Sequence, residues 1–215
     1  MFGGSLIALF YTSIPTSEYY DRTIDTCAAV GFDVENTSEP FPPASGEHKR
    51  AEGISFNGWD ATLRFHLNSD RVSKQPALTI GGMTESIAPR GVQSLKIHQE
   101  RMDTLFELLC RLAIALESSY VAVAQTEGRP NAITPTGRPI AEHVDTPPRI
   151  GIYVPKVLDT FGGVAELFDS EPWYVAELTD GRVVVIESPT PWADGGWQPP
   201  TSAEFIKHTG VHTRE

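Results

Sequence analysis

The stretch VQSLKIHQERMDTLFELLCRLAIALESSYVAVA, residues 92–124, decides the fold class of this chain. From Val92 to Leu116, apolar residues recur at steps of three and four, so they share one face of a helix and leave charged residues on the other. These apolar residues are Leu95, Met102, Leu105, Phe106, Leu109, Leu112, Ala113 and Leu116. The apolar run from Tyr120 to Ala124 follows and is typical of a buried strand. A long amphipathic helix that leads into a buried strand predicts a mixed α+β fold with this helix at its centre.

The chain before this stretch begins with a strand and a helix. Residues 5–11, SLIALFY, are a short apolar run rich in strand formers. The break that follows offers Thr16 or Ser17 as the N-cap of a helix. Gly31 is suited to end that helix in a left-handed conformation. The sequence therefore predicts a helix between these positions.

Two strands are expected between that helix and the central one. Residues 62–67 alternate between apolar and polar side chains, and residues 77–80 are the expected pairing partner. Residues 36–53 are rich in Ser, Pro, Glu and Gly, so we expect an exposed loop insertion over residues 36–60. The order strand, helix, strand, strand, helix, strand predicts a ferredoxin-like split βαβ core (β-α-β-β-α-β) over residues 1–126.

The C-terminal part is expected to extend this core. Residues 127–149 are a connector rich in Pro, Gly and Thr, and residues 150–215 form an extension that packs on the core, because a lone hairpin is marginally stable. Within it the sequence predicts a strand, a short helix, a β-hairpin across Asp180-Gly181 and a last short helix with a capping box. Their expected ranges are 150–154, 155–161, 173–178 paired with 182–188, and 201–208.

Composition and charge narrow the classes of partner. The chain has 215 residues and a formal net charge of -11 at pH 7. Nucleic acid is a poor match, because phosphate binding depends on clustered Lys and Arg. The acidic charge suits a basic protein partner, with solubility alone as the alternative use. The longest apolar window, residues 105–116, contains Glu107 and Arg111 and is shorter than the roughly 18 residues a membrane span needs. We expect a soluble chain that begins at Met1 in the cytoplasm, binds no membrane and has an unspecified oligomeric state.

The two cysteines lie far apart in the sequence. Cys27 and Cys110 both fall on the apolar sides of predicted helices, where free buried thiols are common. A disulfide between them is the alternative, and it is uncommon in the cytoplasm.

The side chains that carry chemistry form no known catalytic motif. GxSxG, HExxH, P-loop, GxGxxG and CxxC patterns are all missing from the sequence. Three candidates remain: His208 with His212 as metal ligands, residues 142–145 (EHVD) as a general base, and Ser118 or Ser119 as a nucleophile. Each has a structural alternative. The histidines can belong to a frayed tail, residues 142–145 to a polar surface connector, and the serines to the end of the helix. We expect no catalytic residue, no metal and no cofactor.

Tryptophan and acidic residues on loops are the candidates for partner binding. A tryptophan on a loop either anchors the loop on the core or forms a recognition hot spot with an acidic rim. We favour packing. If recognition holds instead, the partner-binding residues are Trp59, Glu177, Asp180, Glu187, Trp192, Asp194 and Trp197.

The layout resembles the immunity proteins of bacterial polymorphic toxin systems, in particular immunity protein 52. The matching elements are an opening strand and helix, SLIALFYTSIPTSEYYDRTIDTCAAVGF, and a long helix that runs into a strand, LFELLCRLAIALESSYVAVAQTEGR. A third block is RIGIYVPKVLDTFGG followed by YVAELTDGRVVVIES. The chain departs from the pattern at Gly151-Ile152, where Gly-Trp is expected. The resemblance implies a non-catalytic inhibitor of a cognate toxin and carries over no individual functional residue.

Two functions follow as hypotheses. The first is a non-catalytic protein-binding module, namely an immunity protein that neutralises a toxin. The alternative is a small-molecule-binding or hydrolytic enzyme domain on a ferredoxin-like sheet, with its pocket between the sheet and the C-terminal loop. A structural role stays open as a third possibility.

Overall fold

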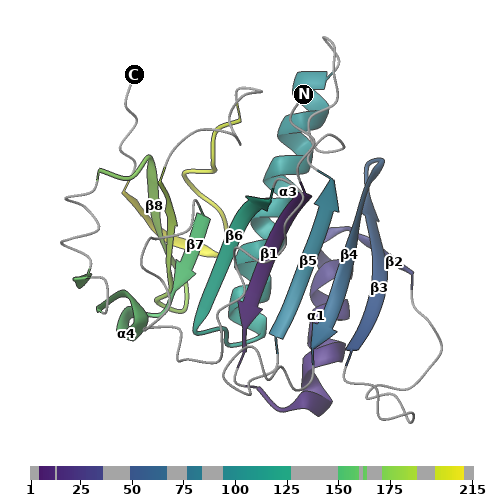
Figure 1. Cartoon of the computed structure of the whole chain (residues 1–215). Coiled ribbons are helices and arrows are strands. Elements are labelled where there is room, and N and C mark those ends of the chain that lie inside the picture. Colours follow the sequence, from purple (N-terminus) through teal and green to yellow (C-terminus); the bar gives the residue numbers. More distant parts are fainter. Residues whose placement is uncertain are drawn as a thin grey trace.

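The structure is a computed structural model that describes residues 5–12, 14–35, 49–66, 77–83, 94–126, 150–159, 162–163, 171–187 and 197–210. These residues form one ten-stranded sheet, with two long helices packed on one of its faces (Figure 1). The strand order is β10-β8-β9-β7-β6-β1-β5-β4-β3-β2. All neighbouring pairs are antiparallel. The predicted α+β class is confirmed.

The elements have the following bounds. The strands are β1 (Ser5–Tyr11), β2 (Asp33–Glu35), β3 (Lys49–Phe56), β4 (Trp59–His66), β5 (Ala77–Met83), β6 (Tyr120–Thr126), β7 (Ile150–Tyr153), β8 (Tyr174–Leu178), β9 (Val183–Ile186) and β10 (Ile206–Gly210). The helices are α1 (Thr16–Val30), α3 (Ser94–Ala115) and the short α4 (Pro155–Leu158). Among the described residues, no helix is long and apolar enough to span a membrane.

The sheet is larger than the predicted ferredoxin-like unit. The four strands expected in that unit lie side by side in the order β6-β1-β5-β4. Strands β3 and β2 extend the sheet beyond β4, and β7, β9, β8 and β10 extend it beyond β6. The ferredoxin-like assignment is therefore not confirmed. The predicted C-terminal extension continues the same sheet, because β7 pairs with β6 from Tyr120↔Tyr153 to Val123↔Ile150. The connector at 127–149 lies outside the described residues.

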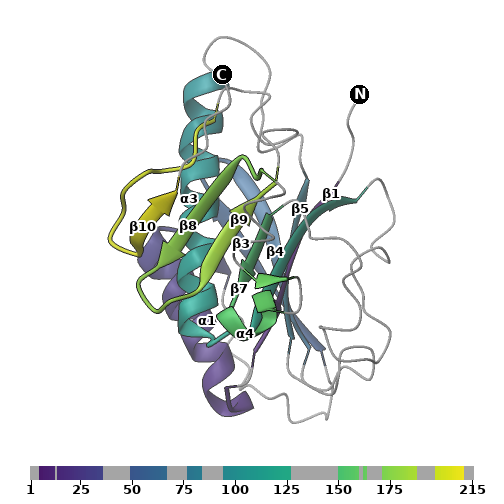
Figure 2. The same cartoon turned by 90° about the vertical axis from the view of Figure 1, so that its left-hand side faces the viewer.

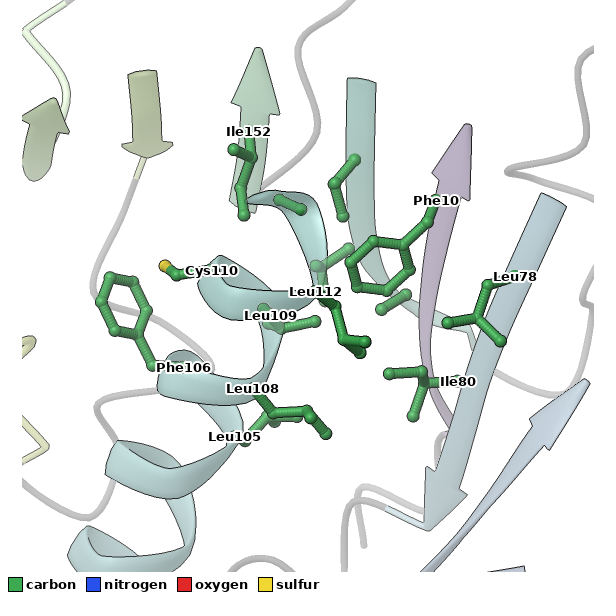
Figure 3. Packing of buried hydrophobic residues seen from close by; sticks show 14 of the residues in the cluster. Phe10, Leu78, Ile80, Leu105, Phe106, Leu108, Leu109, Cys110, Leu112 and Ile152 are labelled. Carbon is green, nitrogen blue, oxygen red and sulfur yellow. The ribbon is translucent and has the colours of Figure 1, made fainter. Parts of the chain in front are cut away.

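Helix α3 packs against both halves of the sheet, because strands β7 to β10 turn round it (Figure 2). In Figure 3, Leu112 points toward Phe10 of β1, whereas Phe106 points toward the C-terminal strands. The Phe106 ring meets that of Tyr174 on β8 edge to face, with centroids 5.8 Å apart. All four side chains are buried. The apolar stripe seen in the sequence thus covers two groups of strands at once.

Arginines from distant elements bind backbone carbonyls at and just beyond the C-terminal end of α3. The helix has no basic residue in its last turn. Arg22 of α1 donates to the Ala115 carbonyl oxygen at 3.0 Å, and Nε of Arg182 donates to that of Ser118 at 2.8 Å. Cations are favoured at this end of a helix, where backbone carbonyls lack intrahelical partners. These contacts tie α1 and the β8–β9 hairpin to the central helix.

Strand β3 corrects the predicted loop insertion. Residues 49–56 were expected to be loop, yet they pair with β4 over its whole length. Asn57 and Gly58 join the two strands with φ values of 47° and 70°. Two central residues with positive φ are the mark of a type I′ hairpin turn. Arg101 of α3 holds this turn by donating from Nε to the Asn57 carbonyl oxygen at 3.0 Å. Residues 36–48 lie outside the described residues.

The C-terminal helix prediction is wrong. Residues 201–205 contain no helix, and β10 begins at Ile206 and pairs with β8. The capping-box pattern is a local signal, and pairing with the edge of the sheet outweighs it. The predicted hairpin of β8 and β9 is present, but only Gly181 of its Asp180-Gly181 pair has a positive φ, at 87°.

The ends of α1 match the prediction in part. The helix ends at Gly31 with φ 96°, as predicted. It begins at Thr16, with Pro15 in the N-cap position and no side-chain cap. Thr16 and Ser17 are therefore the first helical residues rather than the cap.

Candidate protein-interaction surface

The sheet face that carries neither α1 nor α3, here called the helix-free face, has an apolar half and a polar half. The apolar half is a buried cluster over β1, β6, β7 and β9, to which the short helix α4 adds Leu158. Its members are Leu9, Tyr11, Tyr120, Ala122, Tyr153, Leu158 and Val185. The rings of Tyr11 and Tyr120 stack at 5.6 Å, and those of Tyr120 and Tyr153 lie 5.3 Å apart. Burial raises the pKa of all three phenols. They stay neutral at physiological pH and serve packing.

The polar half of this face covers β5, β4, β3 and β2. Ile54, Leu63 and Phe65 turn their side chains to the helix side and are buried there. Their neighbours in the strands are polar or small, and they are half-buried or exposed. These neighbours are Asp33, Glu35, Ala51, Gly53, Ser55, Asp60, Thr62, Arg64 and Gly81. An antiparallel sheet with one packed and one solvated face has this pattern.

The three described acids nominated from the sequence lie at different points along the β8–β9 hairpin. Glu177 binds Lys207 of β10 with an N–O distance of 2.7 Å, and this hydrogen bond lowers the pKa of Glu177. Asp180 forms an ion pair with Arg182. Glu187 follows β9 and is half-buried. Two of the three carboxylates are thus already compensated by cations of the chain itself.

The described tryptophans of the nominated set are core residues. Trp59 and Trp197 are both 0% exposed. Trp59 opens β4 and packs against the ring of Phe32 at 5.9 Å. Trp197 donates from Nε1 to Asp103 of α3 at 2.8 Å. Both follow the packing interpretation and offer no surface to a partner.

The position of Trp59 in an alternating pattern of apolar residues indicates that it is buried. Trp59, Ala61, Leu63 and Phe65 alternate with polar residues, and all four are buried. Extending the predicted strand back by three residues would have placed Trp59 on its inner side. Trp192 and Asp194 lie outside the described residues.

Several exposed acids that have no described ion-pair partner lie on α1 and β2, and none of them was nominated from the sequence. Asp21 and Asp25 are exposed on the outward face of α1, and Asp33 and Glu35 are exposed on β2. None of these four forms an ion pair with a described residue. Glu18, by contrast, is bound by Arg22. Two patterns in the sequence indicated these acids. Asp21 and Asp25 are four residues apart and so share one helix face, and residues 33–35 alternate as acid, apolar residue, acid.

Ser118 and the two cysteines are buried in the fold. Ser118 is buried, and its carbonyl oxygen accepts a hydrogen bond from Arg182. Cys27 and Cys110 are free and buried, as expected. Burial raises the pKa of Cys27 to about 12 and that of Cys110 further, so neither is a thiolate at neutral pH.

The proposed metal and base groups give no described site. His208 is exposed on β10, whereas His212 and residues 142–145 lie outside the described residues. Within the part of the chain that the structure describes, no three His, Cys, Asp or Glu side chains cluster as metal ligands do.

Comparison with known proteins assigns no family. No family model and no curated protein matches the chain. A solved structure, the Pseudomonas aeruginosa T6SS protein PA0821, is similar with a TM-score of 0.49 and 10% sequence identity. The match covers 85% of this chain and 66% of that one, so the chain spans just under two thirds of that protein's length. The chain is not assigned to a family.

Proposed function

We propose that this chain is a non-catalytic protein-binding module, an immunity protein that neutralises a cognate toxin in the cytoplasm of the cell that makes it. The observation that carries the proposal is the charge: the chain has a net charge of -11, and the exposed acids of α1 and β2 have no described cationic partner. Uncompensated acids attract a basic protein over a distance and hold it in register on contact.

The use of the buried polar groups supports a role without chemistry. Glu52 is buried on β3, and its Oε1 accepts from the Tyr20 hydroxyl at 2.9 Å. Arg101 and Arg182 donate to backbone carbonyls and fix a hairpin turn and a helix end. Polar groups that lock backbone elements in this way stabilise the fold.

Neutralisation would then follow from occlusion. A stable protein–protein interface buries roughly 800 Å² on each partner. An immunity protein that covers the active surface of its toxin with such an area blocks substrate access without altering a covalent bond. The inhibition is therefore stoichiometric.

Growth of cells that express the protein encoded beside this chain tests the proposal. We expect that neighbour to be basic and toxic, and we expect growth to return when this chain is co-expressed and co-purifies with it. Unchanged toxicity in the presence of folded chain would contradict the proposal.

A further inference from the structure

We propose that β2 is the docking edge, where an extended segment of a basic protein partner adds to the sheet with Lys or Arg side chains facing Asp33 and Glu35. The inference rests on the proposed function and specifies its contact. The partner segment would supply backbone hydrogen bonds along β2, and its alternate side chains would supply the charge.

The geometry of β2 suits strand addition. It is the last strand on its side of the sheet, and β3 is its only partner among the described residues. Val34 is half-buried and packs on the core, whereas Asp33 and Glu35 are exposed. The two acids therefore belong to the helix-free face. The side chains of an added strand would also point alternately to the two faces of the sheet. Every second one would therefore lie on the helix-free face, beside the acids.

A glycine on the neighbouring strand makes room for one of these acids. A Cβ atom at Gly53 of β3 would lie 2.6 Å from Oε2 of Glu35. The carboxylate of Glu35 thus lies over the bare backbone of β3 and keeps its charge on the helix-free face. An added strand would lie on the other side of β2 from β3, so a long Lys or Arg side chain must reach across β2 to bind this carboxylate.

The opposite edge of the sheet is built differently. The pairing of β10 with β8 shifts register between Ile206 and His208. Lys207 lies at this irregularity and binds Glu177. Bulges and lysines are devices that block pairing at a sheet edge. Strand β2 is short and charged, which also limits pairing, but its acids admit a basic strand, whereas the bulge and the lysine oppose one at β10.

The negative charges of β2 determine which kind of strand can pair with it. A second copy of the chain paired through β2 would bring its own Asp33 and Glu35 beside these acids, and like charges in adjacent strands are destabilising. A basic strand avoids this repulsion and gains two ion pairs. The occupant is therefore a basic segment of another protein.

A lysine–valine peptide with the sequence KVKVKVK tests this inference on the full chain. We expect it to bind in low salt and to slow hydrogen exchange of the β2 backbone amides. The peptide KPKPKPK has the same charge but cannot form the ladder, because proline lacks the amide donor. Equal protection of β2 by both peptides, or no protection by either, would overturn the inference.

Two charge-neutralised variants separate the edge from the net charge. D33N/E35Q and D21N/D25N each remove two exposed carboxylates, so they change the net charge equally. Loss of two exposed ion pairs should weaken KVKVKVK binding about fivefold in D33N/E35Q and less than about twofold in D21N/D25N. Circular dichroism of both variants verifies folding. Equal weakening would overturn the inference.

The toxic neighbour separates this inference from the proposed function. If it binds D33N/E35Q as tightly as the native chain, the docking edge is wrong and the proposed function stands. If it binds neither the native chain nor the variants, the proposed function itself fails.

Discussion

Gly31 and Glu117 end the two long helices in the same way. At α1, the amide of Gly31 donates to the Ala28 carbonyl at 3.0 Å, and φ of Gly31 is 96°. At α3, the amide of Glu117 donates to the Ile114 carbonyl at 3.0 Å, and φ of Glu117 is 49°. The residue after each closes a second bond to the helix, which completes a Schellman motif. Only the glycine was recognisable from the sequence, because glutamate is rare in the left-handed conformation.

Replacing Gly31 by alanine should destabilise the chain through the backbone alone. A Cβ atom there would meet only a ring carbon of Phe56 at 3.9 Å, which is ordinary contact. The left-handed conformation costs a non-glycine residue about 1 kcal/mol, and we expect that loss in the free energy of unfolding measured in urea. Gly31→Asn should lose less, because asparagine tolerates this conformation. An alanine variant as stable as the native chain would contradict the assignment.

Arg182 and Arg22 offer a matched pair of helix-capping variants. Arg182 is buried and bonds the Ser118 carbonyl, so Arg182→Met should cost about 2 kcal/mol by leaving that carbonyl without its donor. The Arg22 side chain is 38% exposed, and water can replace its bonds. We therefore expect Arg22→Met to cost clearly less than Arg182→Met. Chemical denaturation of both variants measures the difference, and equal losses would contradict the role given to Arg182.

At the scale of elements, helices and strands with strongly periodic apolar residues were predictable, whereas a strand that forms through pairing with its neighbours was not. Helix α3 and strands β1, β5 and β6 were expected because their apolar residues repeat with the period of the element. Strand β3 was missed because its segment, KRAEGISF, follows a proline-rich stretch and has few apolar residues. The Asn57-Gly58 pair after it is typical of a two-residue hairpin turn, and it indicates that strands lie on both sides.

The candidate surface was less predictable than the fold. The acids on the β8–β9 hairpin were nominated because they lie near tryptophans in the sequence. Which carboxylates are compensated depends on Lys207 and Arg182, and only the three-dimensional arrangement reveals those pairs. The burial of Trp197 depends likewise on Asp103 of a distant helix.

The fit between Gly151 and Tyr153 in β7 gives a prediction at this scale. A Cβ atom at Gly151 would clash with the hydroxyl and ring of Tyr153, and the tyrosine is buried. We expect Gly151→Ala to cost about 2 kcal/mol in the free energy of unfolding, as overpacking does. Adding Tyr153→Val makes room for the methyl group, so the double variant should lose less than the sum of the single losses. Additive losses would show that the two residues do not compete for space.

The contact between Trp197 and Asp103 predicts a pH dependence. Burial raises the pKa of Asp103, although the hydrogen bond from Trp197 opposes the shift. The folded chain therefore binds a proton at Asp103 more tightly than the unfolded chain, and this contribution to stability declines as pH rises from about 4. Asp103→Asn keeps an acceptor for Trp197 and removes the charge. The variant should exceed the native chain in unfolding free energy at pH 7 and match it below about pH 4. A difference that does not change with pH would contradict this explanation.

At the scale of the whole molecule, one sheet unites both parts of the chain. Strand β6 of the first part pairs with β7 of the second, and α3 packs against strands from both. Within the described part of the chain, the polar half of the helix-free face and the two edges are what this arrangement leaves for partners. Of the two edges, β2 carries acids without a described cationic partner and β10 carries a bulge with a lysine.

We propose above all that this chain acts by stoichiometric recognition and makes or breaks no covalent bond. The most direct test is a titration of the purified chain into a fixed amount of the toxic neighbour, with residual toxin activity as the readout. We predict that activity falls in proportion to the added chain and vanishes at equimolar amounts. Full loss of activity at a small fraction of the toxin concentration would mean that each molecule acts repeatedly, which would contradict the account.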